Sequence, residues 1–263
     1  MPELVEVERY RVLAERAIDR TIATVESPDG WFLKGAATAQ LLEGVLAGSR
    51  FTAARRIGKL LLLDVDVDVG PVVGIRFGMT GTLLVDGDDA VGQLLYGPTV
   101  RSSAWERWAV TFADGGRMVV HDPRRLGGVT LDPDVSGLGP DAASIGMGGL
   151  TTALAGSATP LKARLLDQSR LAGVGNLIAD EVLWRAGLSP LRPAGSLDNT
   201  EVRRLHRALG STLADLSDRG GSHLGDLMEE RHPGGVCPKD GRSLTRSTVG
   251  GRTSWWCPLH QVG

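Results

Sequence analysis

Residues 160–190, PLKARLLDQSRLAGVGNLIADEVLWRAGLSP, hold two short apolar patterns on either side of a glycine-rich turn. The apolar residues that recur at helical spacing are Leu161, Leu165 and Leu166 before the turn, and Leu177, Ile178, Val182, Leu183 and Ala186 after it. The turn, Ala-Gly-Val-Gly-Asn, allows one helix to end and another to begin almost at once. Asn176 is a candidate N-cap of the second helix, which would leave backbone N–H groups pointing outward. The pattern fits either an ordinary helical hairpin or a clamp for DNA phosphate.

Length and composition indicate a soluble globular protein of two domains. The 263 residues can form two cores of ordinary size, and 42% of them are hydrophobic. No apolar run approaches the ~20 residues of a membrane span and no secretory leader pattern is seen, so we expect a cytoplasmic protein. The net charge of −2 gives no sign of a nucleic-acid partner. Any surface for anions must come from local segregation of charge.

The N-terminal Met-Pro-Glu-Leu predicts a helix that begins immediately, because proline suits the first helical position. Glu3 and Glu6 fall one turn apart, near the positive end of that helix. One interpretation is a well-started amphipathic helix and nothing more. The other is chemical, because removal of Met1 would expose the secondary amine of Pro2. Such an amine can attack a carbon of aldehyde oxidation level and form an iminium, while a neighbouring carboxylate moves the protons.

Between residues 21 and 131 the sequence changes to short β-rich runs separated by turns, which predicts an antiparallel sandwich or barrel. The expected strands are Arg50–Arg56, Leu60–Val67, Val72–Phe77, Thr82–Val85, Trp108–Phe112, Met118–His121 and Gly128–Leu131.

Two loops interrupt these strands in an unusual way. Phe77-Gly78-Met79-Thr80-Gly81 puts an unbranched apolar side chain between glycines, and Asp122-Pro123-Arg124-Arg125-Leu126-Gly127 is basic and then apolar. Met79 is either a core-filling residue or an exposed wedge on a tight loop.

A stretch rich in glycine and proline, residues 132–150, predicts a linker between domains. The helical stretch follows it, with a further helix expected from Asn199 to about Asp218. We therefore divide the chain into residues 1–131, the linker 132–150, a helical domain over 151–228 and a C-terminal hairpin over 229–263.

The hairpin contains both cysteines of the chain, each followed by proline. In a reducing compartment a disulfide is disfavoured, and tetrahedral Zn²⁺ requires four ligands. The spacing His-x4-Cys and Cys-x2-His favours zinc over two free thiols, with His232, Cys237, Cys257 and His260 as ligands and His223 or His206 as a replacement for His232. Arg252 lies at a glycine turn within this hairpin, where it suits bidentate contact with phosphate.

In combination and order, these motifs resemble the formamidopyrimidine-DNA glycosylase/endonuclease VIII family of bacteria. The resemblance rests on the N-terminal Met-Pro-Glu-Leu, Gly58-Lys59, the two loops around Met79 and Arg124, residues 162–190 and the terminal hairpin. It implies an α+β fold: an N-terminal helix plus an antiparallel β-sandwich, then a helix–two-turns–helix domain with a C-terminal zinc-finger β-hairpin. DNA would bind between the two domains of a monomer.

The resemblance also implies a function, namely base-excision repair in the cytoplasm, associated with the nucleoid. Such enzymes flip a damaged nucleotide out of double-stranded DNA, because its glycosidic bond cannot be reached in the stack. The base is then expelled and the strand cut by β,δ-elimination. The implied catalytic residues are Pro2, Glu3, Glu6 and Lys59. The implied DNA contacts are Met79 in the void left by the flipped base, Arg124 facing the orphaned base and Leu126 as a wedge against the neighbouring base pairs, with Lys162, Asn176 and Arg252 at phosphates. Structural Zn²⁺ would be the cofactor.

The chain departs from the family pattern at four places. Val5 replaces a second proline, Leu126 replaces an aromatic wedge, the zinc ligands are His/Cys/Cys/His rather than four cysteines, and the segment from Gly220 to Cys237 is short where oxidised-purine enzymes carry a longer lesion cap. The lesion is therefore open between an oxidised base, an abasic site, a crosslink and a bulky adduct. The alternative hypothesis is a protein of the same fold that binds damaged DNA without excision.

Overall fold

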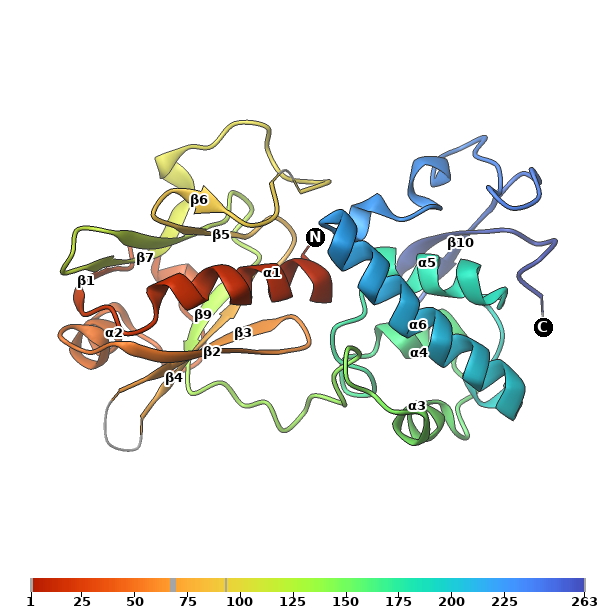
Figure 1. Ribbon diagram of the computed structural model, residues 1–263, viewed down its shortest axis with the longest axis horizontal. Helices are drawn as coiled ribbons and strands as arrows, with labels where there is room; N and C mark the ends of the chain where they lie inside the picture. The colour runs from red at the N-terminus through yellow and green to blue at the C-terminus, as the bar shows by residue number, and fades with distance from the viewer. Residues whose placement is uncertain (1, 67–69, 93, 263) are drawn as a thin grey trace. The chain divides into compact units, whose positions relative to one another are not determined.

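The computed structural model describes residues 2–66, 70–92 and 94–262, which fall into two compact units. One unit contains Pro2 and Glu6–Ser136, and the other contains Glu3–Val5 together with the chain from Gly137 onward (Figure 1). The chain thus changes unit twice within its first six residues. Val67 of the expected strand Leu60–Val67, and Met1, lie outside the described residues.

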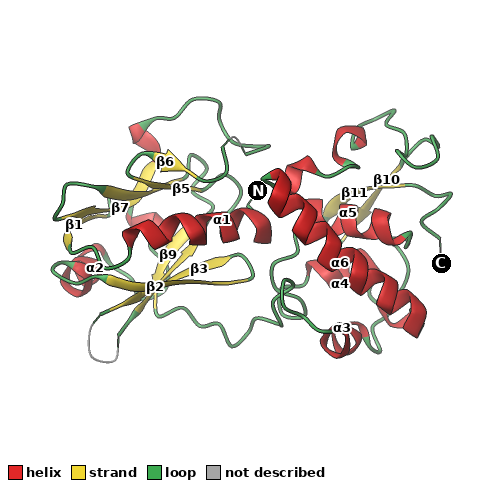
Figure 2. Ribbon diagram, in the orientation of Figure 1, coloured by secondary structure: helices red, strands yellow, loops and turns green. Residues whose placement is uncertain are grey.

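The first unit is built on helix α1 (Leu4–Ala14) and two antiparallel sheets (Figure 2). The five-stranded sheet has the order β1 (Ile22–Glu26), β7 (Glu106–Phe112), β8 (Arg117–His121), β5 (Thr82–Val85) and β6 (Asp88–Asp89). The four-stranded sheet has the order β2 (Phe51–Ile57), β3 (Leu60–Val65), β4 (Val72–Arg76) and β9 (Gly128–Leu131).

One hydrophobic cluster joins α1 to both sheets. Val7 and Tyr10 of α1 are buried with Leu61 of the four-stranded sheet and Trp108 of the five-stranded sheet. The Tyr10 ring lies 4.5 Å from that of Phe77, centroid to centroid. This single core confirms the predicted antiparallel sandwich, because both sheets bury their inner faces against one helix.

The expected strands agree with the observed ones to within two residues at each described end, and β5 and β9 match at both ends. Among the strands and α-helices described in the first unit, β1, β6 and α2 (Ala39–Leu46) were not predicted. Only Ile22 of β1 is buried, so this edge strand has no alternating pattern to detect. Helix α2 carried a readable signal, because the Thr38 side chain caps it by accepting a hydrogen bond from the Leu41 N–H.

The second unit is helical and ends in a β-hairpin. Its elements are α3 (Met147–Leu154), α4 (Leu161–Leu166), α5 (Asn176–Ala186), α6 (Asn199–Arg219), β10 (Thr245–Val249) and β11 (Arg252–Trp256). Helix α3 begins inside the stretch expected to be a linker. Helix α6 begins at a capping box formed by Asp198 and Glu201, and its leucine face joins the core of this unit.

The glycine-rich turn between α4 and α5 packs against the N-terminal segment of the chain. Gly173 has φ +108°, and its carbonyl accepts a hydrogen bond from the Leu4 N–H at 3.1 Å. A side chain at Gly173 would meet Leu4, so the turn needs glycine for both its backbone conformation and its close packing. Among the described residues, no helix combines the length and hydropathy needed to cross a membrane.

Candidate functional site

The Glu3 side chain is completely buried and caps helix α5. Its two carboxylate oxygens accept hydrogen bonds from the Leu177 N–H at 2.8 Å and the Ile178 N–H at 3.1 Å. These are first-turn groups that have no partner within the helix, and the positive end of the helix dipole favours a carboxylate there. Two backbone donors therefore fix the orientation of the carboxylate that directly follows Pro2 in the chain.

The prediction that Asn176 is the N-cap of this helix was wrong. Gly175 is the N-cap, and Asn176 is the first helical residue, whose Oδ1 is buried with no hydrogen-bond partner among the described residues. A side chain at Gly175 would overlap the Glu3 carboxylate. The capping group thus comes from a residue 174 positions away, which no local sequence pattern could indicate.

The turn that carries Lys59 is tied to helix α1. Arg56 donates from Nε to Glu8 of α1 at 2.8 Å and from a terminal nitrogen to the Gly58 carbonyl at 2.9 Å. Lys59 is half-buried in this β2–β3 turn, and Glu6 is buried on α1. The structure therefore brings the predicted lysine turn to the helix that carries the predicted carboxylate.

The loops around Met79 and Leu126 are in direct backbone contact. Gly78 has φ +56°, and a Cβ there would overlap the backbone of Leu126 and Gly127. Met79 is half-buried, Arg124 is exposed, and the Leu126 side chain is 53% exposed. The three residues predicted to fill a void in DNA thus lie on one composite surface of the first unit.

Lys162 is placed differently from the prediction. Its side chain is 0% exposed, and Nζ lies 2.7 Å from Asp180 Oδ1 and 2.9 Å from the carbonyl oxygen of Thr253, to which it donates. Burial lowers the pKa of Lys162, although the Asp180 charge opposes that shift. An ammonium group buried in this way cannot reach a phosphate at the surface. The expected phosphate contact is corrected to an internal ion pair.

This ion pair links three elements of the second unit. The other oxygen of Asp180 accepts from Arg231 at 2.7 Å, and Ser254 on β11 donates to Oδ1 at 2.8 Å. Lys162 and Asp180 thereby fix β11 to α4 and α5. Arg252, the first residue of β11, is exposed next to this anchored segment.

Four side chains of the hairpin converge as a candidate metal site: Cys237, Asp240, Cys257 and His260. Their ligand atoms all lie within 4.8 Å of one another. His232, predicted as the fourth ligand, lies outside the cluster and contacts its neighbour's carbonyl, that of Pro233, through Nδ1 at 2.9 Å. The alternative His206 contacts the Ile145 carbonyl, and His223 lies in the short turn after α6. The readable signal was the matched spacing Cys-x2-Asp and Cys-x2-His, but aspartate was not considered as a ligand.

The chemistry of this cluster fits a divalent metal. His260 Nε2 donates a hydrogen bond to the Trp184 carbonyl at 3.1 Å, which leaves the lone pair of Nδ1 facing the other candidate ligands. Trp184 donates from Nε1 to Cys237 Sγ at 3.3 Å. A hydrogen bond from the Arg242 N–H holds the pKa of Asp240 at about 2, whereas burial raises the pKa of the Cys257 thiol. Two sulfurs, an imidazole and a carboxylate are a donor set that zinc accepts.

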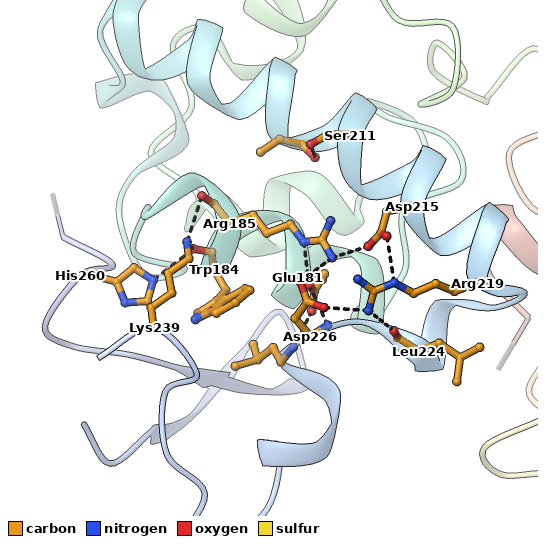
Figure 3. Close-up of polar contacts among 12 residues, drawn as sticks. Glu181, Trp184, Arg185, Ser211, Asp215, Arg219, Leu224, Asp226, Lys239 and His260 are labelled. Atoms are coloured by element: carbon orange, nitrogen blue, oxygen red, sulfur yellow. Dashed lines mark hydrogen bonds and ion pairs between the residues drawn. The ribbon is translucent and has the colours of Figure 1, made fainter. Parts of the chain in front are cut away.

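Helix α5 also holds the short segment after α6. Glu181 accepts from the backbone N–H groups of Asp226 at 3.1 Å and Leu227 at 3.0 Å, and Arg185 pairs with Asp215 and Asp226 (Figure 3). Figure 3 shows Lys239 and His260 at the other end of the helix, beside Trp184. The stretch singled out as short is therefore packed on α5, with Leu227 fully buried.

Comparison with known proteins gives matches over most of the chain. Residues 1–129 match the formamidopyrimidine-DNA glycosylase N-terminal domain, and residues 137–225 match the formamidopyrimidine-DNA glycosylase H2TH domain. A formamidopyrimidine-DNA glycosylase of Thermus thermophilus is 36% identical, with 99% of this chain and 98% of the relative covered. That of Chloroflexus aggregans is 32% identical, with 100% and 99% covered.

Solved structures agree in fold. The crystal structure of the Fpg protein from Thermus thermophilus has a TM-score of 0.79 at 33% identity, covering 99% of this chain and 98% of that one. Fpg of Lactococcus lactis in complex with a DNA containing Fapy-dG has a TM-score of 0.82 at 24% identity, with 99% of each chain covered. The helix-plus-sandwich unit, the two-helix turn and the terminal hairpin define the helix–two-turns–helix class of DNA glycosylases. The chain belongs to the formamidopyrimidine-DNA glycosylase family.

Substitution Gly175→Ala tests the capping role of Glu3. The new methyl group displaces the carboxylate from the α5 amides, so we expect the free energy of unfolding to fall by about 2 kcal/mol, the loss of a cap plus overpacking. The control is Gly148→Ala in helix α3, where an added Cβ meets no described atom within 4 Å outside its own helix, so stability should stay at the wild-type value or rise. Urea unfolding followed by circular dichroism compares each variant with wild type, and a Gly175→Ala protein as stable as wild type would contradict the capping role.

Proposed function

We propose that this chain removes damaged bases from double-stranded DNA with Pro2 as the nucleophile and Glu3 as the proton carrier. Membership of the family makes it a base-excision-repair DNA glycosylase, and abasic-site lyase activity is typical of that family. The observation that carries the residue assignment is the buried carboxylate of Glu3, the residue directly after Pro2. Two backbone N–H groups of α5 hold this carboxylate in place.

The chemistry follows from an amine beside a fixed carboxylate. With the target nucleotide flipped out of the stack, the Pro2 nitrogen attacks C1′ of the sugar as the bond from C1′ to the base breaks, and the base leaves with a proton. Glu3 protonates the sugar ring oxygen, so that the ring opens to an iminium. Loss of a C2′ proton then eliminates the 3′ phosphate, and a second elimination releases the 5′ phosphate. This sequence requires a free proline nitrogen, and hence removal of Met1.

The remaining predicted residues have supporting roles in this proposal. Glu6 is the supporting carboxylate, Lys59 is the phosphate-side lysine, and Arg252 and Asn176 bind phosphates near the lesion. Met79 fills the space that the flipped nucleotide leaves, Arg124 faces the unpaired base, and Leu126 is the wedge against the neighbouring base pairs. Lys162 acts differently from its original assignment, as a positioning residue that anchors the strand of Arg252.

We also assign structural Zn²⁺ to Cys237, Asp240, Cys257 and His260. Bound there, the metal would supply folding energy to a hairpin that has little core of its own. Action as a monomer in the cytoplasm remains part of the proposal.

Borohydride trapping tests the nucleophile. Wild-type protein incubated with an abasic-site duplex and sodium borohydride should form a covalent adduct with DNA, because reduction fixes the iminium. Pro2→Gly should weaken the adduct strongly, and Glu3→Gln should lower the strand-cutting rate by about 10²-fold, the usual contribution of a proton carrier.

Intact-mass analysis of the same preparations reports whether Met1 has been removed. An unmodified Met1 throughout an active preparation would contradict the proline mechanism. Wild type that binds the duplex but forms no adduct would instead favour the non-catalytic binder.

The salt dependence of DNA binding separates Lys162 from Arg252. A residue that contacts phosphate contributes about one unit to the slope of log Kd against log salt concentration. We expect Arg252→Ala to reduce the slope by about 1. Lys162→Met should leave the slope unchanged and lower the free energy of unfolding by about 3 kcal/mol, because it breaks a buried ion pair. A reduced slope with unchanged stability in Lys162→Met would restore its original assignment.

Metal analysis discriminates between the two possible fourth ligands. Elemental analysis by mass spectrometry should find about one zinc per chain in the wild type and in His232→Ala, and well below one in Asp240→Ala. Loss of zinc in His232→Ala alone would reverse the assignment, and absence of stoichiometric zinc from the wild type would remove it.

A further inference from the structure

The two loops that carry Met79, Arg124 and Leu126 both cross between the sheets of the first unit. Residues 77–81 lead from β4 in the four-stranded sheet to β5 in the five-stranded sheet, and residues 122–127 lead from β8 back to β9. These two connecting loops must keep a fixed position relative to each other if their side chains are to form one surface. The hydrogen bonds between paired strands cannot fix that relative position, because both loops lie outside the strands.

Asp122 is the group that joins these loops. Its side chain is 0% exposed, and Oδ1 accepts hydrogen bonds from Thr80 Oγ1 at 2.7 Å and from the Arg124 N–H at 3.1 Å. Oδ2 accepts from the Gly127 N–H at 2.8 Å. One carboxylate thus binds the residue after Met79, the backbone of Arg124 and the residue after Leu126.

The main chain of Asp122 is fixed as well. Its carbonyl accepts from Arg107 Nε at 2.8 Å, and its N–H donates to the Trp105 carbonyl at 2.9 Å. The carboxylate is therefore anchored to the five-stranded sheet, and both loops are positioned relative to that anchor.

Close backbone packing makes the loops respond together. Gly78 packs against the Leu126–Gly127 backbone, so the Met79 loop cannot shift toward the Leu126 loop without displacing it. Arg125 adopts φ +56° and turns its guanidinium to Asp29, at 2.6 and 2.7 Å, while its neighbour Arg124 stays exposed. Arg125 therefore has a structural partner within the protein, whereas the exposed Arg124 can contact DNA.

We propose that Asp122 is a positioning residue that sets Met79, Arg124 and Leu126 as one rigid insert for duplex DNA, and that Thr80 couples the Met79 loop to it. The inference rests on the proposed role of those three residues in filling the void. It adds a specific dependence. Because one oxygen of Asp122 binds both loops, insertion of the apolar side chains and contact of Arg124 with the unpaired base occur together. Asp122 itself touches no DNA in this scheme.

The test uses Thr80→Val, which removes the donor at nearly constant shape, and Thr80→Ser, which restores a hydroxyl. Asp122→Asn weakens the hub itself. The matched control is Thr130→Val, which removes another hydroxyl of the same unit, one that donates to the Gly74 carbonyl at 3.2 Å. Thermal unfolding of every variant checks that the protein stays folded.

Two readouts follow insertion and chemistry separately. The first is the fluorescence of 2-aminopurine placed opposite an abasic site, which rises when an inserted side chain unstacks it. The second compares single-turnover strand cutting at an abasic site in duplex and in single-stranded DNA, because only the duplex has a void to fill.

We expect Thr80→Val and Asp122→Asn to reduce the fluorescence rise and to slow duplex cutting about tenfold, the effect of one lost hydrogen bond to a charged group. Single-strand cutting should stay at the wild-type rate, Thr80→Ser should recover duplex cutting, and Thr130→Val should match wild type.

Wild-type behaviour of both Thr80→Val and Asp122→Asn would overturn the inference. Equal losses on duplex and single-stranded DNA would overturn it too, because they indicate general damage to the fold. If wild type raises the fluorescence but cuts nothing, the proposed function fails while the insertion test still decides the role of Asp122.

Discussion

The hydrogen bonds between the Glu3 carboxylate and the first turn of α5 are the constraint on which the site depends. A fully buried carboxylate is costly unless donors surround it, and the start of a helix supplies unpaired N–H groups and a favourable dipole together. The glycine-rich turn makes this approach possible, because a side chain at Gly175 would occupy the space of the carboxylate. The capping of α5, the glycine at position 175 and the fixed orientation of the Glu3 carboxylate therefore depend on one another.

Buried acidic residues repeat this principle elsewhere in the chain. Asp122 accepts from the backbone of its own loop and from a neighbouring loop, Glu181 accepts from the segment after α6, and Asp180 pairs with Lys162 and Arg231. Each carboxylate joins chain segments that lie apart in the sequence. The exposed residues next to these segments, Arg124 and Arg252 among them, are then held on a fixed backbone, as their proposed contacts with duplex DNA require.

The sequence was sufficient to predict the sandwich, the two-helix turn and α6, because these elements bury periodic apolar faces. It was sufficient also for the family, because motifs such as Met-Pro-Glu-Leu and the terminal hairpin occur in order. It misplaced Lys162 because a lysine beside a phosphate and a lysine beside Asp180 look identical in sequence. It missed the capping by Glu3 and the candidate ligand Asp240 for a related reason: both depend on which distant groups meet, and propensity and spacing describe neighbours along the chain.

The assignment of Glu3–Val5 to the second unit has a consequence for synthesis on the ribosome. The partners of Glu3 follow it by 174 and 175 positions, so the first residues to emerge cannot reach their final contacts until most of the chain has been made. Enzymes that remove the initiator methionine act on short nascent chains, and they would find Pro2 still accessible. Under the proposed mechanism, the Pro2 nitrogen would thus be freed before Glu3 reaches α5, and a growing chain would carry no assembled site.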